Sequence, residues 1–174
     1  MGKRKYKFDW GIITGNLSSA RPQLGLYTRI ELYRLFQFTL RDVLEQHYGA
    51  EHADNLFRDA GLIAGREFFA QFCSKCRSTT ELVNVLQTTF KEFGLGILRV
   101  ESADTENLKF VLTVEEDLDC SGMPDTADQI CVYDEGFIKG ILDSFTGLSF
   151  FVKEIDCWCT GARTCRFLAE KMQE

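Results

Sequence analysis

The sequence has no apolar run long enough to cross a membrane, and its N-terminus lacks the apolar core of a signal peptide. Positive charge is also scarce, because 20 Lys and Arg are outnumbered by 26 Asp and Glu. The net charge of −6 argues against a nucleic-acid-binding domain, whose phosphate contacts need a basic face. We therefore expect a cytoplasmic protein with no membrane contact and no direct contact with nucleic acid.

The signatures of several enzyme classes are missing as well. The chain has no GxGxxG dinucleotide loop, no Ser nucleophile elbow and no His-rich metal pair, since His47 and His52 are its only histidines. The aspartates between residues 117 and 128 lie in a polar loop, and we expect them to be solvated and not catalytic. These absences favour a binding module over an enzyme.

Cysteine is abundant, with seven residues in a chain that shows no export signal. The cytosol keeps thiols reduced, so this number indicates thiols and metal and not disulfides. Cys131, Glu154, Cys157 and Cys165 supply four electron-rich side chains from two places in the chain, as a tetrahedral zinc site needs. Thiolate is a softer ligand than carboxylate, so Cys159 in place of Glu154 is an alternative.

Cys73 and Cys76 form a separate CxxC pair at the end of a predicted helix. The pair is either a redox or metal-binding motif or two helix-end thiols, and the second interpretation is the simpler one.

Phenylalanine is the other abundant residue type, with 15 copies. Aromatic side chains can be ordinary core packing, or they can line an apolar ligand pocket between the helices and the sheet. The candidate pocket residues are Phe69, Phe72, Phe90, Phe110, Phe137, Phe150 and Trp158.

Apolar periodicity predicts most of the secondary structure. Helical spacing is found over residues 28–48, 51–72, 78–93 and 129–145. The first of these helices is apolar on more than one face, which predicts that it is buried. Gly61 and Gly65, one turn apart, predict tight packing against another helix.

Alternation of apolar and polar residues predicts the strands. Residues 97–102 and 108–114 form a predicted hairpin, and 164–169 pairs back on 149–156. This order of elements predicts an α+β fold in which helices pack on a small antiparallel sheet. Residues 1–20 are expected to be an irregular arm, and residues 21–174 a single domain.

The segments "GLIAGREFF" and "ICVYDEGFIKGILDSFTGLSFFVKEIDCWCTGARTCRF" resemble the 4-vinyl reductase domain, a small-molecule-binding module. It is also the sensory domain of bacterial activators that respond to phenols and other aromatic hydrocarbons. The resemblance runs from about Arg21 to the end of the chain and implies zinc held by Cys131, Glu154, Cys157 and Cys165. It also implies a fold similar to TRAPP tethering subunits and haem-based gas sensors, and a homodimer formed through N-terminal helices.

Together, these patterns predict a zinc-stapled sensor domain that binds an apolar ligand, aromatic or hydrocarbon, and signals to a downstream domain or partner in transcription regulation. A phenol sensor needs a buried hydrogen-bond donor for the hydroxyl, often His or Trp. Both histidines flank Gly49 at a helix junction that we expect to be exposed, and Trp10 and Trp158 lie near the chain ends. A purely apolar ligand therefore fits better than a phenol. The alternatives are a non-catalytic scaffold or assembly subunit, and an accessory protein in tetrapyrrole vinyl reduction.

Overall fold

The computed structural model describes residues 5–126 and 128–173, and contacts divide the chain into two compact units, Met1–Val43 and Leu44–Glu174. The first unit holds α1 (Trp10–Thr14), α2 (Leu17–Ala20) and most of α3 (Ile30–Tyr48). Two one-turn helices therefore lie in the segment expected to be irregular, of which residues 1–4 fall outside the described residues. The boundary between the units lies within α3.

The helix α3 ends at the predicted residue and begins two residues later than predicted, but it does not have the predicted burial. None of its residues is buried, and its apolar side chains include Leu35 at 60% and Phe36 at 69% exposure. The prediction of a buried helix is therefore wrong for the single chain. Contiguous apolar surface of this kind is typical of an interaction site.

The second unit contains the longer helices, α4 (Ala50–Phe68), α5 (Thr79–Phe93) and α6 (Val132–Thr146), with a π-helical turn η1 (Phe69–Cys73) directly after α4. Ser78 caps α5, because its hydroxyl accepts the backbone N–H of Glu81. Gly94 ends the helix with a φ of 68°, a left-handed conformation that glycine adopts without steric cost. Among the described residues, no helix combines the length and apolarity needed to span a membrane.

The sheet is antiparallel throughout, and its strand order is β1-β2-β4-β3. Its members are β1 (Ile97–Asp104), β2 (Lys109–Glu115), β3 (Phe150–Asp156) and β4 (Cys165–Lys171). The predicted hairpin and the pairing of the last two strands are confirmed, and so is the α+β class. Alternate residues of β4, Cys165, Phe167 and Ala169, are buried on the inner face.

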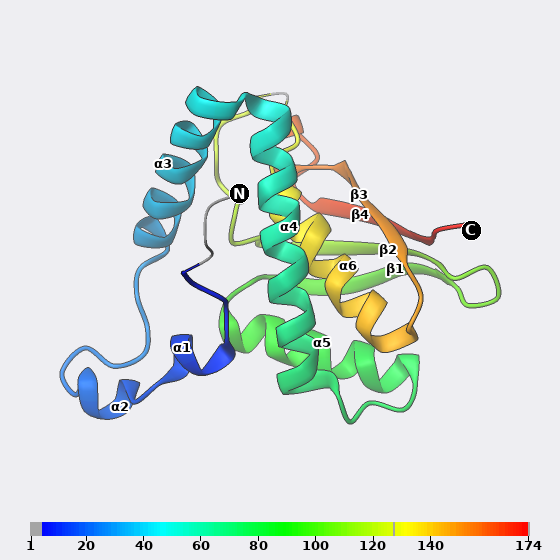
Figure 1. Ribbon diagram of the computed structural model, residues 1–174. Coiled ribbons are helices and arrows are strands. Elements are labelled where there is room, and N and C mark those ends of the chain that lie inside the picture. Colours follow the sequence, from blue (N-terminus) through cyan, green and yellow to red (C-terminus); the bar gives the residue numbers. More distant parts are fainter. Residues whose placement is uncertain (1–4, 127, 174) are drawn as a thin grey trace. The chain divides into compact units, whose positions relative to one another are not determined.

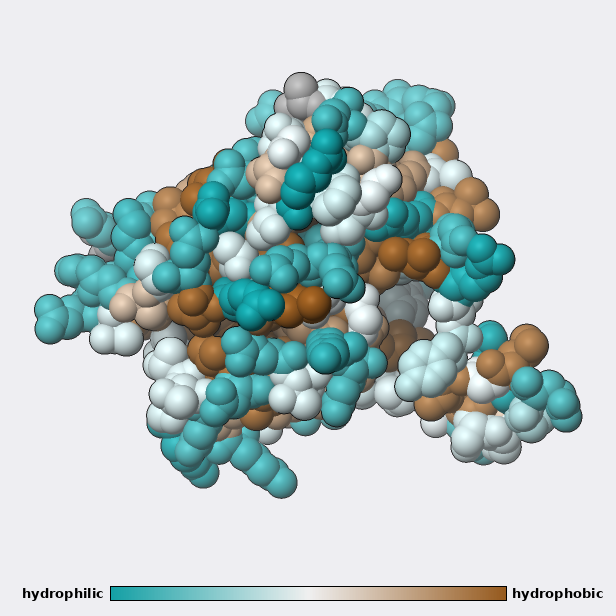
Figure 2. Space-filling view, turned by 180° about the vertical axis from the view of Figure 1, so that it is seen from behind, coloured by the Kyte–Doolittle hydropathy of each residue, from teal (hydrophilic) through white to brown (hydrophobic). Residues whose placement is uncertain are grey.

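The outer face of the sheet mixes hydrophilic and hydrophobic side chains (Figure 2). Arg166 of β4 forms ion pairs there with Glu101 and Asp156, while Ile155 of β3 is exposed. This face therefore has the composition of an ordinary solvated sheet surface, and the core lies on the helical side.

The inner face is covered in two layers (Figure 1). α6 packs against β3 and α5 against β1, and α4 crosses α6 on the side away from the sheet. A Cβ built on Gly61 or Gly65 would lie 2.1 Å from a backbone oxygen of α6, so only glycine allows this approach. The predicted tight packing is confirmed, and Gly136 and Gly140 of α6 complete the contact.

Candidate functional site

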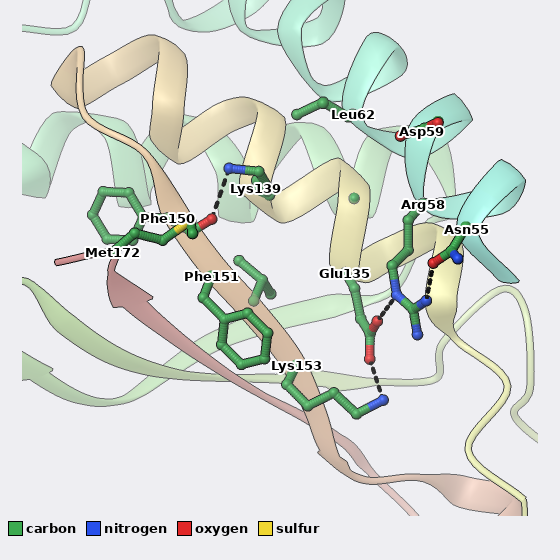
Figure 3. A pocket seen from close by; sticks show the side chains of 12 residues that line it. Asn55, Arg58, Asp59, Leu62, Glu135, Lys139, Phe150, Phe151, Lys153 and Met172 are labelled. Atoms are coloured by element: carbon green, nitrogen blue, oxygen red, sulfur yellow. Dashed lines mark hydrogen bonds and ion pairs between the residues drawn. The ribbon is translucent and has the colours of Figure 1, made fainter. Parts of the chain in front are cut away.

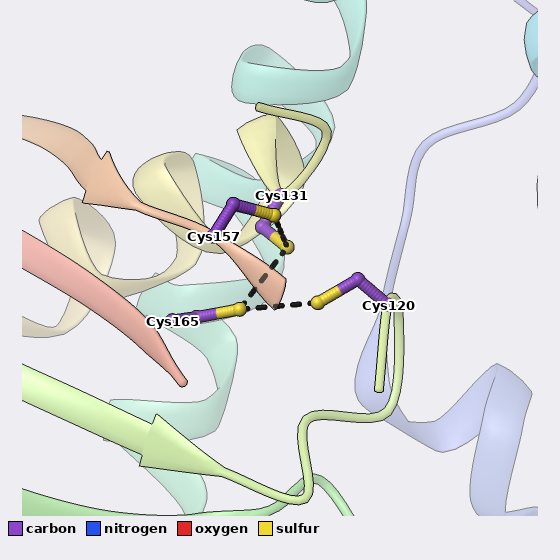
Figure 4. A group of neighbouring side chains, drawn as sticks. All are labelled: Cys120, Cys131, Cys157 and Cys165. Carbon is purple, nitrogen blue, oxygen red and sulfur yellow. Dashed lines mark hydrogen bonds between the residues drawn. The ribbon is translucent and has the colours of Figure 1, made fainter. Parts of the chain in front are cut away.

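Four buried cysteines meet at one end of the sheet (Figure 4). Cys120 comes from the loop after β2, Cys131 precedes α6, Cys157 follows β3 and Cys165 begins β4. Each is at most 1% exposed, and their Sγ atoms all lie within 4.8 Å of one another. The cluster therefore joins four segments that are far apart in the sequence.

Local hydrogen bonds explain why the loops present these thiols. The Oδ1 atom of Asp117 accepts the backbone N–H groups of Asp119 at 2.9 Å and Cys120 at 3.1 Å, which fixes the turn carrying the Cys120 thiol. After the bulge that ends β3, the hydroxyl of Thr160 accepts the N–H of Cys157. Gly161, at a φ of 93°, then turns the chain back toward β4.

The spacing of the sulfurs suits a tetrahedral metal ion. Zinc–sulfur bonds of about 2.3 Å place the sulfurs of a tetrahedral site about 3.8 Å apart. Cys131 lies 3.9 Å from Cys157 and 3.7 Å from Cys165, which matches this value, and Cys120 lies 3.1 Å from Cys165, which is closer. Four thiols of this geometry are a donor set that zinc prefers.

The thiols also shift one another's acidity. The pKa of Cys157 is lowered by hydrogen bonds from neighbouring thiols, of which that of Cys120 has the largest effect and that of Cys131 the second largest. The pKa of Cys131 is raised, and the largest cause is its contact with Cys120. The metal-free cluster therefore favours one thiolate that neighbouring thiols stabilise. A metal that binds all four sulfurs must displace the remaining protons.

Glu154 lies beside the cluster. It is 1% exposed, its Oε2 atom accepts the N–H of Cys131 at 3.2 Å, and its Oε1 atom has no hydrogen-bond partner among the described residues. Burial, followed by the charge of Cys157, raises the pKa of Glu154 to about 9. A buried oxygen without a partner is a costly feature that a proton or a cation would relieve.

Of the predicted ligand set, the structure brings Cys131, Cys157 and Cys165 together and places Glu154 against the backbone of Cys131. Cys120 joins them, and sequence reasoning missed it as a partner of these three thiols. Cys159 is buried but is not a member of the close group. The only signal for Cys120 was its residue type.

Asp117 and Asp119 are buried at 3% exposure, so the expectation that the aspartates of this loop are solvated is wrong for these two. Burial, with the charge of Asp119 second, raises the pKa of Asp117 to about 7. One oxygen each of Asp117 and Asp134 lies within 4.8 Å of the Cys131 sulfur, so carboxyl groups line one side of the cluster.

The aromatic residues expected to line a pocket are distributed over several places. Phe72, Phe90 and Phe137 pack around Phe68, with ring centroids 4.7 to 6.2 Å from its own. The other contacts are Phe110 stacked on Phe150, Phe69 against Phe145, and Trp158 under Arg163. The predicted residues therefore fill space against neighbouring rings in separate groups.

Cys73 and Cys76 stand apart from the cluster, at the end of the π-helical turn. Cys73 is buried, and burial raises the pKa of its thiol to about 12. A thiol of this acidity is almost fully protonated at neutral pH, which does not suit a reactive thiolate.

A family model described as the V4R domain matches residues 110–171, a segment that contains the four clustered cysteines and Glu154. Over these residues the chain is similar to the V4R domain. The resemblance to the 4-vinyl reductase domain is thereby confirmed. The V4R segment supplies β2, α6, β3 and β4, while α4 and α5 precede it.

An uncharacterized protein of Methanocaldococcus jannaschii is 28% identical over 82 residues, which are 47% of this chain and 48% of the relative. The match thus spans about half the length of the curated relative. The V4R segment provides less than half of this chain, so the remaining helices are described by the structure alone.

Three solved structures share the fold. The phenol-responsive sensory domain of the transcription activator PoxR, with phenol, has a TM-score of 0.63 at 17% identity, covering 84% of this chain and 76% of that chain. A vinyl-4-reductase family protein from Methanocaldococcus jannaschii has a TM-score of 0.62 at 14% identity, covering 98% and 100%. A trafficking protein particle complex subunit 3 from Naegleria fowleri, covalently bound to palmitic acid, has a TM-score of 0.64 at 15% identity, covering 83% and 95%. The predicted likeness to TRAPP subunits is confirmed as a likeness of fold.

A cleft of about 480 Å³ lies between the V4R elements α6 and β3 and the preceding helix α4 (Figure 3). At its base the carboxylate of Glu135, 1% exposed, pairs with the guanidinium of Arg58 at 2.5 Å and the ammonium of Lys153 at 2.9 Å. Of the aromatic residues predicted to line a pocket, only Phe150 is among those that line this cleft.

Proposed function

We propose that the chain is a zinc-stapled sensor domain of the cytoplasm that binds a small apolar molecule and passes the signal to a downstream domain or partner in transcription regulation. The observation that supports it best is the cluster of four buried thiols, whose sulfurs all lie within 4.8 Å of one another, within the V4R segment. The match of residues 110–171 to the V4R domain and the fold shared with the PoxR sensory domain support the sensing role. The role is binding and not catalysis.

Zinc would act here as a structural ion. Cys131, Cys157 and Cys165 provide three ligands, and the fourth position has two candidates, the Cys120 thiolate and the Glu154 carboxylate. Cys120 is favoured because its sulfur lies within the close group, whereas Glu154 already accepts a backbone hydrogen bond from Cys131. Four protein ligands fill a tetrahedral shell, so the ion would hold the loops together and not act on a substrate.

Native mass spectrometry of the purified protein, with zinc quantified on the same sample, tests the proposal. We expect one zinc per chain and a small apolar molecule either co-purified or bound on addition of phenol or toluene. Protein that holds no zinc after purification or zinc addition, and that binds neither compound, would contradict the proposed function.

Three single variants identify the fourth ligand. Cys120→Ser should lose zinc, Glu154→Gln should retain it, and Cys159→Ser is the matched control, since Cys159 is equally buried but outside the close group. X-ray absorption of the wild-type protein should then show four sulfur neighbours. Zinc lost from Glu154→Gln and retained by Cys120→Ser would assign the position to the carboxylate.

The proposal includes a homodimer formed through the N-terminal helices. Its support is the apolar surface of α3, where Leu32, Leu35 and Phe36 are each more than half exposed. Light scattering should give twice the chain mass, and Phe36→Glu should shift the protein to the monomer. An unchanged mass in that variant would place the interface elsewhere.

A scaffold role is the second candidate, and the aromatic packing around Phe68 favours it. Side chains that fill their own core leave little room for a ligand among them. A zinc-loaded protein that binds no small molecule would support this alternative.

A further inference from the structure

We infer that the cleft between α4, α6 and β3 binds a small organic carboxylate, whose head group is held by Arg58 and Lys153 and whose apolar body lies beside Phe151. This inference rests on the sensing role in the proposed function and extends it, because it names the site of the ligand and adds a carboxylate head group to its apolar body.

The size and lining of the cleft suit such a molecule. At about 480 Å³ it falls in the range of small-molecule sites, which combine apolar walls with a few placed polar groups. Leu62, Phe151, Val152 and Met172 form apolar walls, and Phe151 and Met172 are each about half exposed. Figure 3 shows Phe151 beside β3 and next to Lys153, and Met172 farther from Glu135, near Lys139. The cleft thus combines the charged group around Glu135 with an apolar wall that begins at Phe151.

Around Glu135 the cleft has more positive than negative charge, and some N–H donors of its cations have no acceptor. Arg58 uses Nε for Glu135 and Nη1 for Asn55, and its Nη2 has no partner among the described residues. Lys153 donates to Glu135, which leaves further N–H groups of its ammonium for another acceptor. Two cations thus share one buried carboxylate. A second carboxylate would balance the remaining charge and accept these donors.

The other charged residues that line the cleft do not neutralise the excess positive charge of Arg58 and Lys153. Lys139 is already engaged by Asp143 at 2.8 Å and by the backbone oxygen of Phe150 at 2.7 Å. Asp59 is exposed, and its charge is screened by solvent. The head group is therefore expected at Arg58 and Lys153.

The same site connects to the cysteine cluster. The Oε1 atom of Glu135 also accepts the backbone N–H of Glu154 at 3.0 Å, and the carboxylate of Glu154 accepts the N–H of Cys131 at 3.2 Å. Two buried carboxylates thus link the cations of the cleft to a clustered cysteine. A ligand that draws Arg58 and Lys153 toward itself weakens their ion pairs with Glu135. It can change the cysteine cluster only to the extent that it binds the arrangement with weakened ion pairs more tightly than the arrangement with intact ones.

The test is a titration of the zinc-loaded full chain with benzoate, followed by ¹⁵N-amide NMR. Benzamide, a neutral molecule of nearly the same shape, is the ligand control. We expect benzoate to shift the amides of Phe151, Lys153 and Lys139, and to bind more tightly than benzamide. The set of amides that shift in the wild-type protein therefore tests where benzoate binds, before any variant is made.

Variants then test the head-group contact. Arg58→Gln and Lys153→Met should each weaken benzoate binding by about tenfold or more, as expected for the loss of a charged hydrogen-bond partner. Arg99→Gln is the matched control, because Arg99 also pairs with a glutamate but lies on β1, at the opposite edge of the sheet. Arg58→Lys should recover part of the affinity.

The zinc release rate reports the link to the cluster. Benzoate should change the rate at which a chelator removes zinc from the wild-type protein and should have little effect in Lys153→Met. The inference is overturned if benzoate shifts no cleft amide at millimolar concentration, or binds equally well to wild-type, Arg58→Gln and Lys153→Met proteins. Toluene or phenol binding in that case would leave the proposed function standing, whereas absence of zinc and of all binding would contradict both.

Discussion

Replacing Gly65 by alanine tests the closest packing in the second unit, the crossing of α4 and α6. A Cβ at this position would lie 2.1 Å from the backbone oxygen of Phe137, and one at Gly136 would lie 2.0 Å from that of Arg58. Ordinary contact begins at 3.4 Å, and the obstructing atoms are backbone, so a side-chain rotation cannot relieve the clash. The two helices must therefore move apart.

The expected loss of stability is large for a single methyl group. Overpacking in a core costs typically about 1–3 kcal/mol, and a clash between two backbones belongs at the upper end, offset by about 1 kcal/mol from the better helix propensity of alanine. We expect a net loss of about 2 kcal/mol for Gly65→Ala or Gly136→Ala. For a domain of this size, the melting temperature should fall by about 4 to 8 °C.

Thermal unfolding followed by circular dichroism measures this effect, with Gly147→Ala as the control. Gly147 has a φ of 71° and nothing within 4 Å of its built Cβ, so alanine there costs only the left-handed conformation, about 1 kcal/mol. If Gly65→Ala and Gly136→Ala both melt no lower than Gly147→Ala, the helices are not held by glycine contact. Gly136→Ala should also weaken benzoate binding, because it moves Arg58 relative to the adjacent Glu135.

Three further measurements follow from the core and the buried acids. Phe137→Ala should cost about 3–5 kcal/mol, because this ring is 8% exposed and packs on Phe68, whereas the half-exposed Phe151 should cost much less when truncated; similar values for both in urea unfolding would contradict the packing. Ser78→Ala should cost about 1 kcal/mol through the lost cap of α5, measured in the same way, and no loss would mean that the cap is not formed in solution. In the metal-free protein the pKa values of Asp117, about 7, of Glu154, about 9, and of Asp134 lie above their ordinary values, while the pKa of Cys157 lies below its own. Between about pH 5 and about pH 7, three carboxyl groups thus keep protons that the unfolded state has lost, and one thiol has lost a proton that the unfolded state keeps, so the folded state binds more protons. Stability is then full at acidic pH and is lost as the pH rises, and the melting temperature should fall from about pH 5 to about pH 8; a rise across this range would contradict the assignment.

Local signals predicted the elements well, because their causes are local. The cap at Ser78, the stop at Gly94 and the alternation in β1 and β2 each depend on residues a few positions apart. The glycine pair of α4 predicts a packing surface, which the structure confirms, but its partners Gly136 and Gly140 on α6 lie 75 residues later, and only the folded chain shows that they meet.

The candidate site was predictable only in part, for a similar reason. Cys131, Cys157 and Cys165 carry the spacing of a ligand set and do come together. Cys120 reaches them because Asp117 is buried and binds two backbone N–H groups, and no short pattern distinguishes such an aspartate from the solvated ones beside it.

The failed prediction for α3 has a different origin. An apolar pattern reports which side chains avoid water in the assembled protein, and it does not say which chain covers them. The pattern of α3 is as apolar as the sequence indicates, yet the single chain buries none of its residues. Leaving Leu35 and Phe36 in water forfeits about 1.5–3 kcal/mol for each side chain relative to full burial. If the α3 helices of two copies of the chain cover each other, each chain gains this free energy from burial. Association of two copies is therefore the simplest physical explanation of the exposed surface.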